Sequence, residues 1–419
     1  MTDTLAIYDC EVAIIGGGPS GLAAATELKR LGLKRVIILE REAYAGGIPR
    51  HCGHPPFGMR EFKRVYTGQR YAQNLVKRAK KARVTFRFNT TVSAIEPDGC
   101  LQLSTLEGLQ TLKAERVIIC TGARETPRAG RLVSGQRPAG VMTTGTLQSA
   151  VYLHQQQPFK QPVIIGTELV SFSALLTCRH AKIRPVAMIE PNARITSKMG
   201  SQSLSALLGV PIHLNTTVIE IIGKQTVTGL KVRDALGDTQ LIECDGVIFT
   251  GQFIPESSLM RASHLKVNPQ TGLPLIDQFN RCSDPNYFAI GNMTHPVETA
   301  GTCWQEGVDT AQHIHASLTG SLNQRMPRIE IKHDNAHIKY VTPSLIALPI
   351  QTNANTLHIK LKTHSSRISH GRLIVQHKSQ TLNVKNISAL PERKITLKLP
   401  DLSGFMAEDT LNLMFEASD

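Results

Sequence analysis

The chain reads VAIIGGGPSG from Val12 to Gly21, a short apolar run that ends in a cluster of glycines. Gly16 permits a tight turn between a strand and a helix, Gly18 lets the backbone approach a pyrophosphate, and Gly21 lets the helix pack closely on the strand. The next apolar run ends in an acid, Glu40, whose carboxylate can accept hydrogen bonds from ribose hydroxyls. This spacing predicts a strand–turn–helix unit that binds a dinucleotide at a helix N-terminus.

Further short Val/Ile runs follow, and each ends in a glycine. They end at Gly122, Gly166, Gly251 and Gly291. Apolar runs of this length that alternate with helical stretches are typical of parallel βαβ units. The sequence after residue 324 is different, because it holds only two of the 32 glycines and alternates apolar with polar residues, as in Ile395–Leu399. We therefore expect an α/β protein with two Rossmann-like, three-layer dinucleotide-binding domains, followed by a small all-β, sandwich-like domain.

The composition excludes several classes of protein. The 419 residues include 47 Lys and Arg against 33 Asp and Glu, a net charge of +14. We interpret the basic run Arg60–Arg87 as a solvated face and expect no specific nucleic-acid partner. Eight scattered cysteines without a Cys-x-x-Cys pair indicate no metal site. No run of about 18 apolar residues and no basic signal segment are present, so we expect a cytoplasmic protein without a transmembrane segment.

Four strings of residues indicate a family. They are Gly46–His54 (GGIPRHCGH), Phe57–Met59, Arg137–Gln148 (RPAGVMTTGTLQ) and Gly291–Pro296 (GNMTHP). With the glycine-rich turn, the chain resembles the two-dinucleotide-binding-domain flavoproteins of the glutathione-reductase type, the pyridine nucleotide-disulphide oxidoreductases. The strings resemble most the branch that holds the flavoprotein subunits of sarcosine oxidase, opine oxidase and hydrogen cyanide synthase, together with glycerol-3-phosphate-dehydrogenase-like proteins.

The resemblance implies that the cofactor is FAD and that its domain is discontinuous. We expect an FAD-binding domain at 1–125 and 275–324, a second, degenerate NAD(P)-type domain at 126–274, and the all-β domain at 325–419. The residues implied to bind FAD are Gly16, Gly18, Pro19, Ser20, Gly21, Glu40, Arg41, Gly46, Gly47, Thr121, Gly122, Gly291 and Asn292.

The second nucleotide fold departs from the pattern of the first. Gly166 stands where it should, but Glu168 occupies the second glycine position and Ser171 the third. A carboxylate adds bulk and repulsion where a pyrophosphate would approach, and burying it costs free energy unless it is paired. We expect that this fold is retained as a scaffold. NAD(H) binding stays open, and Glu190 at the end of the next strand argues against NADP.

Three residues are candidates for the chemistry at the flavin: His51, Cys52 and His295. Oxidation of a substrate by a flavin often needs a base, and histidine titrates in the useful range. Cys52 stands alone in the loop where disulfide reductases of the superfamily carry a redox pair, so a dithiol relay there is excluded. The alternative functions of Cys52 are a flavin adduct, a redox-sensitive thiol or simple packing.

Four arginines after the second of the glycine-ended runs are candidates for binding an anionic or zwitterionic substrate: Arg124, Arg128, Arg131 and Arg137. The sequence therefore predicts an FAD-dependent oxidoreductase whose flavin accepts a hydride from a small amine, amino acid or hydroxy acid. Its electrons would pass to a quinone, to oxygen or to a partner flavoprotein. The alternatives are an NAD(P)H-dependent reductase, and an FAD-binding electron-transfer or scaffold subunit of a hetero-oligomer.

Overall fold

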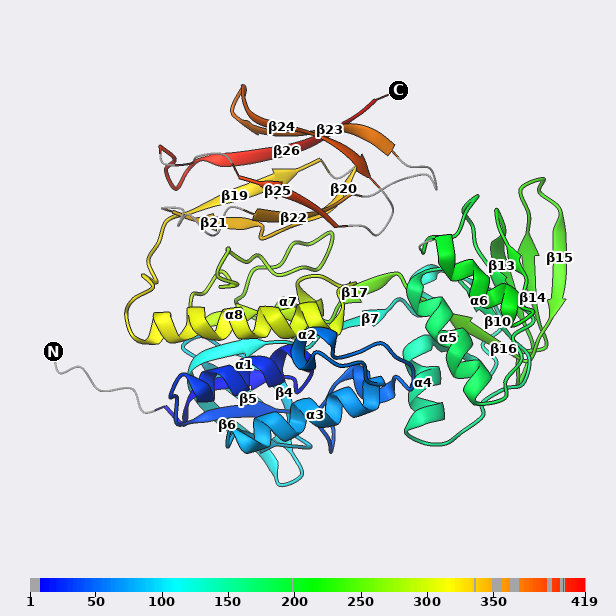
Figure 1. The fold of residues 1–419 in the computed structure, drawn as a ribbon, viewed down its shortest axis with the longest axis horizontal. Coiled ribbons are helices and arrows are strands. Elements are labelled where there is room, and N and C mark those ends of the chain that lie inside the picture. The colour runs from blue at the N-terminus through cyan, green and yellow to red at the C-terminus, as the bar shows by residue number, and fades with distance from the viewer. Residues whose placement is uncertain are drawn as a thin grey trace.

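The structure is a computed structural model of the chain. It describes residues 8–197, 199–334, 337–348, 356–361, 369–389, 394–399, 402 and 404–418. Figure 1 shows three bodies: a blue, cyan and yellow part at the N-terminal end, a green part beside it, and an orange and red part stacked above.

The first parallel sheet is built around the glycine-ended strand β1. Its strands are in the order β3-β2-β1-β6, and β18 also pairs with β6. The strands are β1 (Cys10–Ile15), β2 (Val36–Leu39), β3 (Thr85–Arg87), β6 (Gly108–Ile119) and β18 (Tyr287–Ala289). The long strand β6 extends beyond this sheet and pairs antiparallel with β5 (Cys100–Thr105), which pairs with β4 (Thr91–Ile95).

Each face of the first sheet has its own core. Helices cover one face: α1 (Pro19–Arg30), α3 (Gly68–Lys81) and α8 (Ala300–Leu318). Val12 and Ile14 point to this helical side, whereas Ala13 and Ile15 point to the other side, because successive strand residues alternate between faces. The other core is closed by the β4–β6 ribbons and by residues near α7 (Ser258–Arg261). The first fold therefore has three layers.

The second parallel sheet repeats this plan in the green part of Figure 1. Its order is β12-β11-β10-β16-β9, and all four pairs are parallel. The strands are β9 (Val141–Thr143), β10 (Pro162–Ile165), β11 (Ala187–Ile189), β12 (Ile212–His213) and β16 (Gly246–Phe249). On one face lie α4 (Thr144–Tyr152), α5 (Leu169–His180) and α6 (Gln202–Leu207).

A four-stranded sheet, β15-β14-β13-β8, covers the opposite face of the second parallel sheet. Its strands are β8 (Ser134–Gly135), β13 (Thr217–Ile222), β14 (Gly229–Arg233) and β15 (Thr239–Glu243). The two folds are joined by a short antiparallel ribbon of β7 (Ala123–Glu125) and β17 (Phe253–Pro255). Along the chain, β7 follows β6 and β17 follows β16, so the ribbon connects the carboxyl edges of the two parallel sheets.

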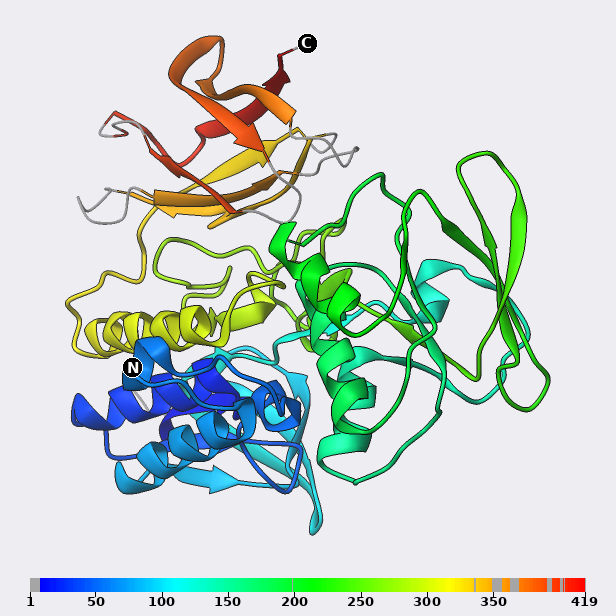
Figure 2. The same cartoon turned by 45° about the vertical axis from the view of Figure 1, so that its right-hand side comes forward.

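The C-terminal part contains two sheets that enclose one core, built mainly of Ile, Leu and Val side chains. Figure 2 shows this strand-rich part above the first fold. One sheet has the order β21-β19-β26-β23-β24, and the other β20-β22-β25. The strands are β19 (Arg328–His333), β20 (Ile338–Thr342), β21 (Leu345–Ala347), β22 (Thr356–Leu361), β23 (Ser369–His377), β24 (Gln380–Ala389), β25 (Lys394–Lys398) and β26 (Thr410–Ala417). The predicted fold class is therefore confirmed.

A buried ionic cluster lies where the sandwich meets the first fold. Asp277 and Arg281 are fully buried, and the Arg281 Nε donates to Asp277 Oδ2 at 2.8 Å. Arg328 of β19 brings its Nε within 3.4 Å of the same oxygen and donates to the carbonyl of Cys282. Buried charges of this kind are stable only when their hydrogen bonds are satisfied. Because Arg328 belongs to the sandwich and Asp277 to the first fold, the cluster holds the sandwich against the first fold.

Within the described residues, no helix is long and apolar enough to cross a membrane.

Candidate functional site

The first glycine-rich turn connects β1 to α1. Gly16 has φ +109°, and a Cβ on Gly21 would lie 2.2 Å from the carbonyl oxygen of Gly16, so both positions require glycine. Gly18 is the N-cap of α1, with φ −78° and ψ −175°. A Cβ on Gly18 would meet nothing within 4 Å, so the space in front of the helix N-terminus is open. Pro19 and Ser20 form the first turn of the helix.

The acid at the end of β2 faces this turn. Glu40 is 8% exposed, and its Oε2 accepts the N–H of Gly17 at 2.9 Å, while its Oε1 accepts the N–H of Glu42 at 3.0 Å. Each carboxylate oxygen retains a further lone pair. Glu40 is thus fixed in orientation and still able to accept hydrogen bonds. Arg41, the next residue, is exposed.

A second pair of glycines packs on the turn. The Gly46 N–H donates to the Gly17 carbonyl at 2.8 Å, and a Cβ on Gly47 would lie 2.9 Å from the Cα of Gly18. Both have positive φ, +129° and +59°. The loop can follow the turn this closely only because it has no side chains there.

Two further predicted segments lie at the carboxyl edge of the first sheet. Thr121, just after β6, donates its hydroxyl to the Glu256 carbonyl at 2.7 Å, and Gly122 follows with φ +81°. Gly291, in a short 3-10 turn (η4, Gly291–Met293), has φ +76°, and a Cβ there would lie 2.6 Å from the hydroxyl of Ser20. The structure therefore brings Gly291 to the start of α1, although Ser20 and Gly291 are 271 positions apart in the sequence.

The side chain of Asn292 points into the loop that precedes α8. Its Oδ1 accepts the N–H of Glu298 at 3.0 Å and lies 3.5 Å from the thiol of Cys303. Its side-chain oxygen is used in shaping this loop.

These features fit FAD. We call the open space in front of the α1 N-terminus at Gly18 the cradle. This space, the buried carboxylate of Glu40 and the close approach of Gly47 match what a pyrophosphate and an adenosine ribose require at a helix N-terminus. Gly16, Gly18 and Glu40 would hold the nucleotide half. FAD, when bound, supplies a ring that accepts a hydride.

The loop Gly46–His54 runs from the cradle to the second fold. It contains a 3-10 turn (η1, Ile48–His51) that packs against α3 and α4. The thiol of Cys52 lies 3.6 Å from Gln148 Oε1 on α4, and the Gln148 amide donates to the hydroxyl of Ser173 on α5 at 2.7 Å. That hydroxyl lies 2.9 Å from His54 Nε2. The loop is therefore held by side chains of α4 and α5 in the second fold.

His51 lies at the end of η1. Its Nδ1 is buried and makes no hydrogen bond to any described residue. Burial lowers the pKa of His51, and the nearby Glu42 partly opposes this effect. His51 is thus a neutral imidazole near pH 7 with one ring nitrogen to offer.

Cys52, the next residue, keeps its proton at neutral pH. It is 7% exposed, and burial raises the pKa of its thiol to about 12. A thiol rather than a thiolate is present at neutral pH, and thiols are poor nucleophiles. All eight cysteines are free, and the closest in sequence, Cys100 and Cys120, are 20 residues apart.

His295 lies on a different loop, after η4. Its Nε2 is 3.4 Å from Glu306 Oε1 on α8, and Glu306 Oε2 accepts the N–H of Gly291 at 2.7 Å. Glu306 therefore ties this loop to α8, which begins at Ala300 with Thr299 as its N-cap.

Three of the four arginines expected to bind substrate are bonded within the chain. Arg124 Nε is 3.3 Å from Glu256 Oε2. Arg128 donates to carbonyls of residues 133–136. Arg131 donates to the carbonyls of Thr126, Thr250 and Gly251.

The turn after β10, which corresponds to the glycine-rich turn of the first fold, is filled by a side chain. Glu168 is the N-cap of α5, and its Oε1 accepts the N–H of Gln252 at 2.9 Å. A Cβ on Gly251 would lie 2.0 Å from the Glu168 carboxylate carbon. Glu190, at the end of β11, is buried and bonded to Thr167, Asn192 and Thr196.

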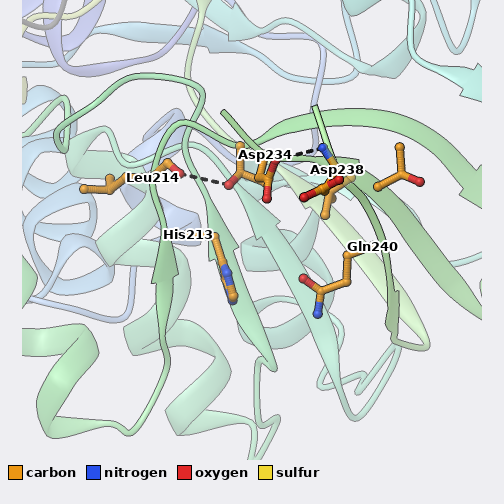
Figure 3. A pocket seen from close by; sticks show the side chains of 8 residues that line it. His213, Leu214, Asp234, Asp238 and Gln240 are labelled. Carbon is orange, nitrogen blue, oxygen red and sulfur yellow. Dashed lines mark hydrogen bonds between the residues drawn. The ribbon is translucent and has the colours of Figure 1, made fainter. Parts of the chain in front are cut away.

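A separate pocket of about 470 Å³ lies on the second fold and is lined by residues from β12 to Thr216 and from the β14–β15 hairpin (Figure 3). His213, Gln240 and the carboxylates of Asp234 and Asp238 line it. Asp234 Oδ1 accepts the N–H groups of Leu236 and Asp238, which closes the turn between β14 and β15. None of the residues that line this pocket belongs to the turn after β1 or to the turn after β10.

Several residues of the site were not predicted from the sequence. Gln148 and Ser173 hold the Cys52 loop, Glu306 holds the Gly291 loop, and the buried Glu125 accepts the N–H groups of Gly145 and Gly251 between the two folds. Burial raises the pKa of Glu125, an effect that these two hydrogen bonds oppose. Gln148 ends one of the strings that carried the resemblance, and that was its only signal.

Two dinucleotide-binding folds joined by a two-stranded ribbon define a class of oxidoreductase. Residues 10–313 match the model of the family described as pyridine nucleotide-disulphide oxidoreductase. The chain therefore belongs to this family of FAD-binding enzymes.

Curated relatives match over part of their length. The chain is 25% identical over 292 residues to the F subunit of alkyl hydroperoxide reductase from Staphylococcus epidermidis, covering 68% of this chain and 54% of that protein. It is 27% identical over 206 residues to the A subunit of opine oxidase from Rhizobium meliloti, covering 49% of this chain and 42% of that protein. The chain thus spans about half the length of the curated relatives it matches.

Solved structures share the fold. Thioredoxin reductase of T. acidophilum superimposes with a TM-score of 0.63 at 25% identity, covering 74% of this chain and 98% of that one. An NAD-dependent persulfide reductase from A. fulgidus superimposes with a TM-score of 0.58 at 16% identity, covering 92% of this chain and 71% of that one.

Proposed function

We propose that the protein is an FAD-dependent oxidoreductase of the dehydrogenase or oxidase type, in which the flavin accepts a hydride from a small amine, amino acid or hydroxy acid. Residues 1–125 and 275–324 form its FAD-binding domain, 126–274 the second nucleotide fold and 325–419 the sandwich. The electrons then pass to a quinone, to oxygen or to a partner flavoprotein.

One observation carries this proposal. The loop that packs on the first glycine-rich turn presents a half-buried imidazole, His51, whose buried Nδ1 has no hydrogen-bond partner among the described residues. Beside it stands a single thiol, Cys52, that is protonated at neutral pH because its pKa is about 12. A proton acceptor without a dithiol suits direct oxidation of a substrate rather than disulfide reduction.

The chain's own groups take defined parts in this reaction. His51 accepts the proton that leaves the amine or hydroxyl of the substrate as its hydride departs, and burial keeps the imidazole neutral for this role. The N-terminus of α8, 19 residues long, stabilises negative charge that develops near it through its dipole. His295 and Glu306 hold the loop at this end of the helix.

The branch and the partner are part of the proposal. The strings at Gly46–His54 and Arg137–Gln148 resemble the sarcosine oxidase, opine oxidase and hydrogen cyanide synthase branch, and one matching relative is named as part of an opine oxidase with more than one kind of chain. An anionic or zwitterionic substrate and a second kind of chain follow from that likeness. An electron-transfer protein that needs another chain for its substrate chemistry is the second candidate, and the added sandwich favours it.

Anaerobic absorption spectroscopy tests the proposal. We expect the purified protein to show a flavin spectrum between 300 and 600 nm. Titration with a panel of amino acids, N-methyl amines and hydroxy acids should bleach it with one class of compound. Bleaching by NADH or NADPH alone would make the protein a nicotinamide-dependent reductase. If no panel member bleaches the flavin unless a partner chain co-purifies with the protein, the second candidate is favoured.

A further inference from the structure

The two nucleotide folds have equivalent turns, because β1–α1–β2 and β10–α5–β11 run in the same order in their sheets. Gly18 and Glu168 are the N-caps of the two helices. Their backbones agree closely, with φ −78° and ψ −175° at Gly18 and φ −68° and ψ 168° at Glu168. Position 168 is therefore a phosphate-facing position of the second fold, and the backbone there has kept the geometry of a binding turn.

The segments that face the two helix N-termini, which follow β6 and β16, are also equivalent in the two folds. The N–H of Cys120 donates to the Ile15 carbonyl after β6, and the N–H of Thr250 donates to the Ile165 carbonyl after β16. Gly251 and the residue after it therefore correspond to Thr121 and Gly122. In the first fold the space before Gly18 is open, since a Cβ there meets nothing within 4 Å.

In the second fold the Glu168 side chain crosses that space. Its Oε1 accepts the N–H of Gln252 at 2.9 Å. A Cβ on Gly251 would lie within 2.0–2.2 Å of the carboxylate carbon and both oxygens, so the carboxylate lies flat against that glycine. Glu168 thereby uses a backbone donor at the edge where a bound dinucleotide would lie.

Arg131 compensates the charge of this carboxylate. It donates to the carbonyls of Thr250 at 2.7 Å and Gly251 at 3.0 Å, and Glu168 and Glu125 both act on it as attractive negative charges. A carboxylate with a backbone donor and a nearby guanidinium is not forced out of the cradle by desolvation.

We propose that Glu168 is an internal anion that occupies the phosphate cradle of the second fold and is the residue that excludes NAD(H) and NADP(H) from it. The Glu168 carboxylate sits where the charge of a pyrophosphate would go, and a pyrophosphate would have to displace it against like-charge repulsion. This conclusion about binding stands by itself. Only its consequence rests on the proposed function: the hydride must come from a substrate bound elsewhere than in the second fold.

Isothermal titration calorimetry of the flavin-loaded protein with NADH tests the inference, since it measures binding whether or not the flavin is reduced. We expect no binding by the wild type. Glu168→Gly should gain binding that is at least about tenfold tighter, because glycine is tolerated as an N-cap and opens the cradle. Glu168→Gln is the matched control. It keeps the size of the side chain and an oxygen for Gln252 but removes the charge, so it should bind NADH more weakly than Glu168→Gly.

Each outcome is decisive once the flavin-to-protein ratio is shown to be the same in all three proteins. Wild-type binding as tight as that of Glu168→Gly would overturn the inference. Failure of Glu168→Gly to bind would also overturn it, because another feature would then exclude the dinucleotide. Binding by Glu168→Gln equal to that of Glu168→Gly would overturn occupation of the cradle by the side chain. The substrate panel, by contrast, tests the proposed function alone.

Discussion

The thiol of Cys52 lies 3.6 Å from the side-chain oxygen of Gln148, across the boundary between the two nucleotide folds. Cys52 belongs to the loop that packs on the first glycine-rich turn, whereas Gln148 lies on the helical face of the second parallel sheet. The Gln148 amide continues the contact to Ser173 and from there to His54. The loop that carries the candidate base is therefore positioned by both folds.

Cys52 should react slowly with alkylating agents in the native protein. Its pKa of about 12 leaves roughly one thiolate in ten thousand at pH 8, and only the thiolate is a good nucleophile. We expect iodoacetamide to label Cys52 at least about 100-fold more slowly in the native protein than after unfolding in urea. Peptide mapping by mass spectrometry measures this ratio. Equal rates would show that the thiol is exposed or activated, and would make Cys52 a candidate catalytic group again.

Gly18→Glu should abolish FAD binding without unfolding the protein. The substitution reproduces at the first turn what Glu168 does at the second, and the backbone at Gly18 accepts a side chain because φ is −78° and a Cβ meets nothing within 4 Å. We expect the flavin-to-protein ratio to fall below about a tenth of the wild-type value, with an unchanged far-UV circular dichroism spectrum.

Leu106→Glu is the control for the Gly18→Glu experiment, because Leu106 is 86% exposed in a turn and the same charge there touches no nucleotide cradle. It should keep its full flavin content. A yellow Gly18→Glu protein with normal flavin content would contradict our assignment of the first turn.

The fold was predictable because its signals are local. Gly16, Gly18 and Gly21 lie within six residues, and the steric demands of the turn select glycine at Gly16 and Gly21 whatever else the chain does. Alternation in the C-terminal part likewise indicates strands one at a time. These patterns need no knowledge of which distant segments meet.

The site was less predictable because its contacts are long-range. Gln148 and Glu306 act on segments that are 96 and 15 residues away, and neither lies in a recognisable pattern for that role. Arg131 illustrates the converse: its charge suggested an anionic ligand, but its guanidinium is taken up by backbone carbonyls. A sequence displays a charge, whereas only the structure displays its partners.

Asp277→Asn should destabilise the protein strongly. Asp277 is fully buried and accepts from Arg281 Nε at 2.8 Å, with Arg328 at 3.4 Å, so the substitution leaves two buried or half-buried guanidinium groups without their anion. Breaking a buried pair of this kind costs about 3–5 kcal/mol. Urea unfolding measured by circular dichroism gives the change in the free energy of unfolding.

The exposed pair Arg372–Glu416, at 2.7 Å, supplies the comparison for Asp277→Asn. Glu416→Gln should cost at most about 1 kcal/mol, because solvent screens that pair. If Asp277→Asn lowered the free energy of unfolding by an equally small amount, the ionic cluster would contribute little to holding the sandwich on the first fold.

His51→Ala should keep the flavin but slow its reduction by substrate at least about tenfold, within the range that general bases contribute. Because burial lowers the pKa of His51 below its ordinary 6.5, the base is neutral and active above pH 6.5. The rate in the wild type should therefore be flat from pH 6.5 upward and decline as the pH falls through the lowered pKa. Stopped-flow absorbance with the panel compound that bleaches the flavin measures both the rate and this acid limb.

The stability of the protein gives an independent check on the same imidazole. The unfolded chain takes up a proton at His51 near pH 6.5, whereas the folded protein resists it, so the stability that the neutral His51 contributes is present above pH 6.5 and is lost as the pH falls. Between pH 7 and pH 5 the wild type should lose more stability than His51→Ala. His370→Ala, at an exposed position of β23, should change neither the rate nor this difference. If His51→Ala reduced its flavin at the wild-type rate and kept the acid limb, the proton would have to go to another group.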